Sequence, residues 1–454
     1  MLREFREALA VFEDICPDWD DRLQAFARSP YYVTGSWTGG ATLVLPMLGI
    51  QPGSGGILKE AKFPYGMDVS AQTVGFDPKQ AIAGHGQFTS PAFAMALATE
   101  MHGFTAHSCV ERGNIAEIPG IIGVGAGISN ENRQDKRARN GATFCIGVVG
   151  MGCYEQYIVE LDIEKGLLTR GQQDAIFTMA FANAMFCAAG IEQTAFPAER
   201  YGLTSPQFVN TQEGCIFALE RHLVTFDRVA LDREGALLYG IDGGSQELKE
   251  LDPSQMVFIP LTARPMTSAH LQLIRSASIR ATRDDGSAKE PVVILSMSHH
   301  SKGMFDEQTM IERISQFTGT SRVLVLEKGA YFRDMVHFIR SVCGPSRGWH
   351  DIVELAVGFD APEILLNPDR YDGATETERR VARNRTLSEI WDCTARFLVA
   401  PRQGKLFTRD LLPLIPKGYE ALFAPLPAQT GSVSSTEYRK VTDSFRNRLR
   451  PPER

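Results

Sequence analysis

The sequence has few of the features that mark secreted, metal-binding or membrane proteins. Its eight cysteines are scattered along 454 residues, with no C-x-x-C pair and no cysteine–histidine cluster at zinc spacing. No window approaches the roughly 18 uncharged apolar residues that a membrane span needs. The stretch MLREFREALAVFEDICPDWDDRL has an amphipathic helical pattern and lacks the apolar core of a signal peptide. We therefore predict a cytoplasmic protein with reduced cysteines and no membrane partner.

Positive charge is also sparse. The net charge is −7, and the densest basic stretch, RQDKRAR at 133–139, is broken by a glutamine and an aspartate. A solvated loop or a phosphate-binding patch would both fit that stretch. Without a basic surface, no nucleic-acid partner is expected. The adjacent pair His299 and His300 has no acidic or cysteine partner at ligand spacing, so we interpret it as a loop pair and predict no metal site.

The composition is that of a globular chain, with 43% hydrophobic and 22% charged residues. Its length favours more than one domain. The polar, turn-rich segment 227–254 contains DREGALLYGIDGGSQELKELDPS and is interpreted as a linker. The domain boundaries predicted from this are 1–226 and 255–454.

Hydrophobic periodicity predicts an α/β fold in the first domain. A strand is expected near 30–34, followed by a glycine turn. Helices are expected over 91–103, 171–190 and 211–226, and a β-rich stretch over 142–161.

In the second domain, short apolar strands alternate with amphipathic helices. Examples are MVFIPL followed by AHLQLIRSASIRA, and PVVILSM followed by EQTMIERISQF. This alternation predicts a doubly wound parallel sheet that binds ligands at the carboxyl ends of its strands. The binding loops would then follow MVFIPL, DIVELAVGF and EALFAPL.

Anion-compatible residues occur in those three places. The first place has a threonine and a histidine at the start of a helix, the second has the tripeptide G-F-D, and the third has hydroxyls and an arginine. Threonine and serine are also ordinary helix N-caps, so a purely structural role stays open. The residues are Thr267, His270, Gly358, Asp360, Ser434, Ser435, Thr436 and Arg439.

Residues 255–445 resemble the cytidylyltransferase-like nucleotidyltransferases, especially the nicotinamide-nucleotide adenylyltransferases. That family carries H/T-x-G-H, then G-x-D, then S-S-T-x-x-R. The resemblance implies that Thr267 and His270 contact phosphate and that Asp360 contacts the nucleotide. It also implies ATP with Mg²⁺ and an acceptor such as nicotinamide mononucleotide (NMN) or its acid form. Leu261 and Ala269 stand where the family has glycine.

The first half carries S-W-T-G-G at 36–40, P-G-S-G at 52–55, F-P-Y at 63–65 and H-G-Q-F-T-S-P at 85–91. This order resembles the CinA C-terminal family, whose relevant activity is NMN deamidation. Taken alone, S-W-T-G-G is also compatible with a capped strand-to-helix turn.

The CinA resemblance implies that Ser36 is the key hydroxyl and that Tyr65 matches the family tyrosine. It implies that the pocket is shaped by the turn of Thr38, Gly39 and Gly40. The position of the family lysine is Ser70 here. A homodimer is also expected, because CinA-like domains tend to self-associate.

Together the two resemblances imply a two-domain protein of pyridine nucleotide metabolism. The first domain would be CinA-like, and the second a nucleotidyltransferase-like Rossmann-type domain. Two alternatives stay open: a nucleotide-binding or regulatory protein with eroded sites, and a transferase that acts on another phosphate ester with CTP as donor.

Overall fold

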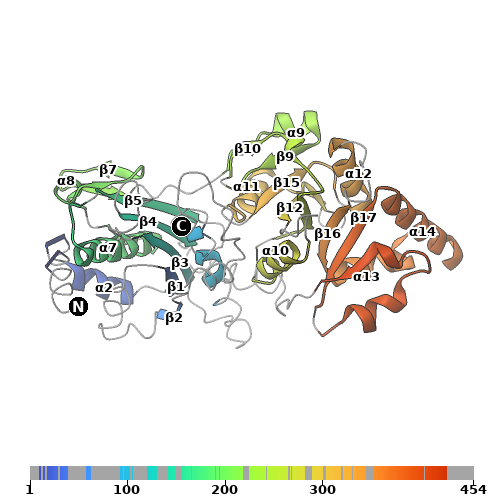
Figure 1. Cartoon of the computed structure of the whole chain (residues 1–454), viewed down its shortest axis with the longest axis horizontal. Coiled ribbons are helices and arrows are strands. Elements are labelled where there is room, and N and C mark those ends of the chain that lie inside the picture. Colours follow the sequence, from blue (N-terminus) through green and yellow to red (C-terminus); the bar gives the residue numbers. More distant parts are fainter. Residues whose placement is uncertain are drawn as a thin grey trace, which may run out of the picture. The chain divides into compact units, whose positions relative to one another are not determined.

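The computed structural model shows two α/β units, Met1–Leu223 with Thr436–Arg454 and Val224–Ser435 (Figure 1). We describe each unit by itself. The description covers the following residues: 10–11, 14–15, 18–28, 31–38, 58–62, 93–95, 97–102, 105, 120–129, 142–149, 156–164, 166–189, 191–193, 195–217, 224–241, 243–263, 266, 268–281, 289–299, 303–318, 321–329, 331–343, 352–402 and 404–426.

The first unit is built on a six-stranded sheet in the order β2-β1-β3-β4-β5-β6. β1 is parallel to β2 and β3, and the remaining pairs are antiparallel. The strands are β1 (Tyr31–Thr38), β2 (Leu58–Lys62), β3 (Gly120–Ser129), β4 (Ala142–Val149), β5 (Gln156–Ile163) and β6 (Leu203–Thr204). The helices are α2 (Trp19–Ala27), α7 (Arg170–Ala188) and α8 (Ala198–Tyr201).

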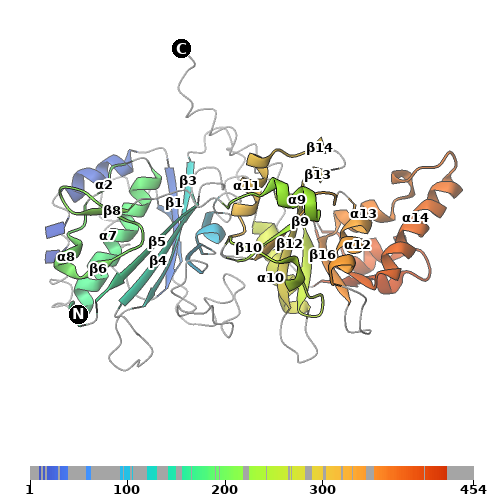
Figure 2. The ribbon, with the colours of Figure 1, turned by 90° about the horizontal axis from the view of Figure 1, so that it is seen from above.

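Helices cover both faces of this sheet. Figure 2 shows α2 and α7 on one side and the cyan helix, residues 93–102, on the other. The α7 side packs on Ile122, Val124 and Ala126 of β3. The helix expected over 171–190 and the β-rich stretch over 142–161 are both confirmed. In the helix expected over 91–103, the described residues 93–95 and 97–102 are helical.

Two glycines let the helix of residues 93–102 lie directly on β3. A Cβ at Gly123 would be 2.6 Å from the Cβ of His102, and one at Gly125 would be 2.5 Å from the Cβ of Leu97. Real Cβ atoms essentially never come that close. β3 therefore presents glycine to this helix and branched side chains to α7.

The strand expected near 30–34 is confirmed and continues to Thr38, because β1 pairs with β3 without interruption from Tyr31 to Thr38. The expectation that Ser36 and Thr38 belong to a turn is therefore wrong, since long-range pairing decides their conformation. The helix expected over 211–226 is wrong for residues 211–217, which form the turn and second strand of a hairpin of β7 (Phe208–Asn210) and β8 (Cys215–Phe217).

The second unit is built on an eight-stranded sheet in the order β10-β9-β15-β12-β11-β16-β17-β18. The strands β15, β12, β11, β16, β17 and β18 are parallel to one another, and β9 is antiparallel to β15. The strands are β9 (Ala236–Tyr239), β10 (Ser245–Gln246), β11 (Met256–Pro260), β12 (Glu290–Ser296), β15 (Arg322–Leu326), β16 (Val353–Gly358), β17 (Ala395–Ala400) and β18 (Phe423–Pro425). A separate two-stranded pair is β13 (Ser298–His299) and β14 (Gly303–Met304).

Alternate side chains of these strands enter two cores. Val257 and Ile259 of β11 face the core of α9, α10 and α11, whereas Phe258 faces the core of α12, α13 and α14. The helices are α9 (Arg228–Glu234), α10 (Ser268–Arg280), α11 (Glu307–Ser315), α12 (Phe332–Cys343), α13 (Asp360–Leu366) and α14 (Glu376–Asp392). Short 3₁₀ turns are η3 (Leu248–Glu250), η4 (Pro368–Arg370), η6 (Leu412–Leu414) and η7 (Glu420–Leu422), and η5 (Phe407–Leu411) is a π-helical turn. The expected α/β class is confirmed, with a large, mostly parallel sheet.

The segment 227–254, interpreted as a linker, forms part of this unit. It contains α9, β9, β10 and η3. Every residue of β9, A-L-L-Y, is buried. Four apolar residues between polar turn formers are too short to stand out in a composition window, although they are enough for one strand.

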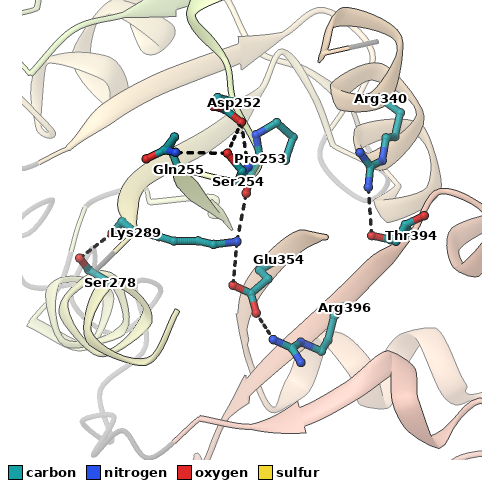
Figure 3. Close-up of polar contacts among 10 residues, drawn as sticks. All are labelled: Asp252, Pro253, Ser254, Gln255, Ser278, Lys289, Arg340, Glu354, Thr394 and Arg396. Atoms are coloured by element: carbon teal, nitrogen blue, oxygen red, sulfur yellow. Dashed lines mark hydrogen bonds and ion pairs between the residues drawn. The ribbon is translucent and has the colours of Figure 1, made fainter. Parts of the chain in front are cut away.

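A buried ion network closes the amino edge of the parallel strands (Figure 3). Lys289 Nζ donates to the carbonyl of Pro253 at 3.0 Å and pairs with Glu354 at 3.2 Å. Arg396 of β17 pairs with the other oxygen of Glu354, its register partner on β16. Lys289 and Glu354 are almost fully buried, so each charge depends on its partners.

We predict that Gly125→Ala destabilises the first unit by about 3 kcal/mol, because the new Cβ collides with backbone atoms that cannot move singly. Urea unfolding followed by hydrogen exchange measures the free energy of unfolding of each unit separately. Gly358→Ala is the control, because it also adds a methyl to a strand glycine, where no atom lies within 4 Å. Equal stability of both variants would contradict the close packing of this helix on β3.

Candidate functional site

The parallel strands of the second unit define where a ligand can enter. Across the sheet they lie in the order β15, β12, β11, β16, β17 and β18. The chain first adds strands outward from β11 on one side and then outward from β16 on the other, so the winding direction changes between β11 and β16. At such a point the crossover helices leave toward opposite faces, and a crevice opens beyond the carboxyl ends of the two strands. The loops after MVFIPL and DIVELAVGF both begin here. We call this place the switch-point site.

The loop after β11 is held in place by α11. Arg313, which is almost fully buried, donates to the carbonyls of Thr262 at 2.9 Å and of Ser296 at 3.1 Å. Gln316, just beyond α11, accepts from the backbone N–H of Met266 at 2.6 Å. These bonds fix both ends of the loop relative to β12.

The same loop contains a strained residue. Ala263 is fully buried and has φ of +35°, a backbone region that residues with a Cβ rarely adopt. Such strain costs of order 1–3 kcal/mol and persists only where the surroundings impose it. The carbonyl of Ala263 accepts from Gln316 at 3.4 Å, so α11 supplies part of that constraint.

His270 lies in the first turn of α10 and is half-buried. Burial, followed by the positive charge of Arg402, lowers the pKa of His270 to about 4. The imidazole is therefore neutral near pH 7 and can donate one N–H to a ligand. Ala269 precedes it in the same turn and is also half-buried.

Asp360 is the first residue of α13, directly beyond β16. Its carboxylate accepts a hydrogen bond from Arg402 Nη1 at 2.5 Å. Gly358 ends β16, and no atom lies within 4 Å of the place where a Cβ would stand. The structure therefore brings Asp360 and Gly358 to the same edge as His270, and adds a cation there.

Sequence reasoning missed Arg402, Lys405 and Arg313. Arg402 and Lys405 follow β17, which lies beside β16, and Lys405 pairs with Glu363 of α13 at 2.8 Å. The stretch P-R-Q-G-K directly after an apolar strand was the available signal. Arg313 sits within an amphipathic helix, where nothing in the sequence separates it from a surface arginine.

Ser36 lies inside β1 and is fully buried. The expectation of an exposed serine on a turn is therefore wrong. Ser36 pairs with Gly125 and Thr34 pairs with Gly123, so both hydroxyls face the helix of residues 93–102. Within the described part of the chain, neither hydroxyl has a hydrogen-bond partner. Leaving a buried hydroxyl unsatisfied costs about 1–3 kcal/mol, so Thr34 and Ser36 both keep an unmet hydrogen-bonding capacity in this fold.

His102, at the far end of that helix, contacts the same face of β3 near Gly123. Burial lowers the pKa of His102 to about 4, against a smaller raising effect of its hydrogen bond to the backbone of Ile121. The imidazole is therefore neutral near pH 7.

Several predicted site residues lie outside the described residues. Thr38 ends β1, and its side chain is not described. The others are Gly39, Gly40, Tyr65, Ser70, Thr267, Ser434, Ser435, Thr436 and Arg439.

Comparison with known proteins does not name a family: no protein-family model matches this chain, and neither does any curated protein. The described residues hold no group of three or more His, Cys, Asp or Glu side chains placed to bind a metal ion. None of the helices in the described ranges has the length and apolarity needed to cross a membrane.

The buried His102 predicts a pH-dependent stability of the first unit. Its pKa is about 4 when folded and about 6.5 when unfolded, so the unfolded state binds the proton first as pH falls. The contribution of His102 to the free energy of unfolding should have its full value above pH 6.5 and should fall by roughly 3 kcal/mol toward pH 4. Urea unfolding between pH 7 and 4.5 measures this fall.

In that experiment His102→Gln should flatten the decline, whereas His337→Gln, which changes an exposed histidine of α12, should leave it unchanged. An identical decline in His102→Gln and in the unchanged protein would show that another group causes it.

Proposed function

We propose that the second unit transfers a nucleotidyl group from ATP to NMN, its acid form or a similar acceptor. The observation that supports this best is the change of winding between β11 and β16, with His270 on one side and Asp360 and Arg402 on the other. A neutral imidazole and a guanidinium in one crevice suit a ligand with several phosphates. The resemblance around T-S-A-H and G-F-D supports the same class.

In this reaction a phosphate oxygen of the acceptor attacks the α-phosphorus of ATP. The new P–O bond forms as the bond to the bridging oxygen breaks, and pyrophosphate leaves with that electron pair. His270 would donate an N–H to oxygens on which charge increases, and the backbone N–H groups at the start of α10 would act in the same way. Arg313 and Gln316 would keep the loop after β11 in position for this contact.

Mg²⁺ would neutralise the triphosphate when ATP binds. Asp360 is the carboxylate described at the switch-point site, and it is paired with Arg402. One carboxylate fits the usual manner of Mg²⁺ binding, in which phosphates and water supply most ligands. The ion would then arrive with the nucleotide, and Asp360 would be its nearest protein ligand.

A nucleotide-binding protein without transfer activity is the second candidate. The half-buried Leu261 and Ala269 favour it, because both carry a Cβ at the edge where the family's glycines let backbone approach phosphate. Binding of ATP or CTP without pyrophosphate release would support this alternative. Transfer activity with CTP and not with ATP would mean that CTP is the donor, while the type of reaction would be the same.

For the first unit we propose NMN binding with hydrolysis of its amide. Water would be consumed, the amide C–N bond broken, and ammonia and the acid form released. The buried hydroxyl of Ser36 supports this, because a substrate group could satisfy it. Ser36 needs a base to act as a nucleophile, and a lysine would supply it in the resembling family.

We predict that His270→Ala lowers kcat/KM for nucleotidyl transfer by about 100-fold, because it removes a donor aimed at the developing charge. Mass spectrometry of dinucleotide and pyrophosphate from ATP, Mg²⁺ and NMN or its acid form provides the measurement. His337→Ala removes an exposed histidine of α12 and should retain full activity. If the unchanged protein forms neither product, the transfer proposal is falsified.

A separate assay tests the first unit. We expect steady ammonia release from NMN, abolished by Ser36→Ala. Thr34→Val removes the neighbouring buried hydroxyl on the same face and should retain most of the release. No ammonia at high protein concentration would exclude the amidohydrolase, and equal loss in both variants would exclude a special role for Ser36.

A further inference from the structure

Arg402 reaches the switch-point site from a third strand. It follows β17, whose last residue, Ala400, is the register partner of Gly358 on β16. Its Nη1 donates to Asp360 at 2.5 Å, and its positive charge also acts on His270. One guanidinium therefore lies close to the candidate residues of both neighbouring loops.

The guanidinium of Arg402 retains unused hydrogen-bonding capacity. It carries five N–H donors, and within the described residues its one side-chain hydrogen bond is the bond to Asp360. Its side chain is 29% exposed, so solvent and ligands can reach it. Arginine in this state can bind phosphate oxygens through two parallel N–H bonds.

The segment after β17 does not depend on Arg402 for its attachment. Lys405 pairs with both carboxylate oxygens of Glu363 at 2.8 Å, one turn farther along α13. Lys405 also stands 5.5 Å from the ring centre of Phe359. Two separate ion pairs therefore attach this segment to α13, and loss of either one leaves the other in place.

We propose that Arg402 is a phosphate-binding residue of the switch-point site, and that Asp360 holds its guanidinium in place until a nucleoside triphosphate binds. This inference rests on the proposed function of the second unit and adds a residue to its site. Asp360 limits the rotamers of Arg402 in the free protein, so less freedom is lost when the polyphosphate binds.

Binding of ATP and of inorganic tripolyphosphate to the full chain, measured by isothermal titration calorimetry, tests the proposal. Arg402→Gln should weaken both ligands by 10-fold or more, and Arg402→Lys should weaken them less, because it keeps the charge and loses the paired donors. Lys405→Gln is the matched control, since it removes the neighbouring cation of the same segment. It should change affinity by less than about 2-fold, the effect of a screened surface charge.

A second measurement verifies the position of Arg402 without any ligand. In an NMR titration, Arg402→Gln should raise the pKa of His270, because a nearby positive charge is removed. Lys405→Gln should leave that pKa unchanged. Equal weakening of tripolyphosphate by Arg402→Gln and Lys405→Gln, or an unchanged His270 pKa in Arg402→Gln, overturns the proposal.

The outcomes separate this inference from the proposed function. If ATP and tripolyphosphate bind through Arg402 and no dinucleotide forms, the transfer reaction is wrong and the phosphate site stands. If dinucleotide forms and Arg402→Gln binds ATP normally, the reaction stands and Arg402 has no part in binding. If neither ligand binds the unchanged protein, both proposals fail.

Discussion

The parallel pairing of β11 with β16 is the constraint on which the candidate chemistry of the second unit depends. These strands are neighbours in space, although about a hundred residues separate them in the chain. Their following helices, α10 and α13, pack on opposite faces of the sheet. The chain therefore diverges above the two strand ends, and side chains that begin the two helices, His270 and Asp360, come to the same edge.

The electrostatics at that edge depend on three partly exposed groups, His270, Asp360 and Arg402. Arg402 pairs with the carboxylate of Asp360, and its positive charge disfavours a second positive charge on His270. The site thus combines one neutral donor with one compensated cation. An incoming polyphosphate would meet donors of both kinds without requiring any group to change its protonation near neutral pH.

The sequence predicts this unit well because its strands are short apolar runs bounded by amphipathic helices, as in MVFIPL before AHLQLIRSASIRA. It predicts the loops of His270 and Asp360 because strand ends of a parallel sheet share one edge. It does not predict Arg402 or Arg313, because their partners lie 42 and 51 residues away and depend on strand order. Ser36 was placed on a turn because glycine tendency is local, whereas the pairing of β1 with β3 is not.

The ion network of Lys289, Glu354 and Arg396 anchors the parallel strands at their amino ends, opposite the switch-point site. The residues that hold the strands together and the candidate ligand-binding residues therefore lie at opposite edges of the same sheet. Because the anchor is at the amino edge, side chains at the carboxyl edge can change while the strands stay in register, so the loops of the switch-point site can vary without loss of the fold.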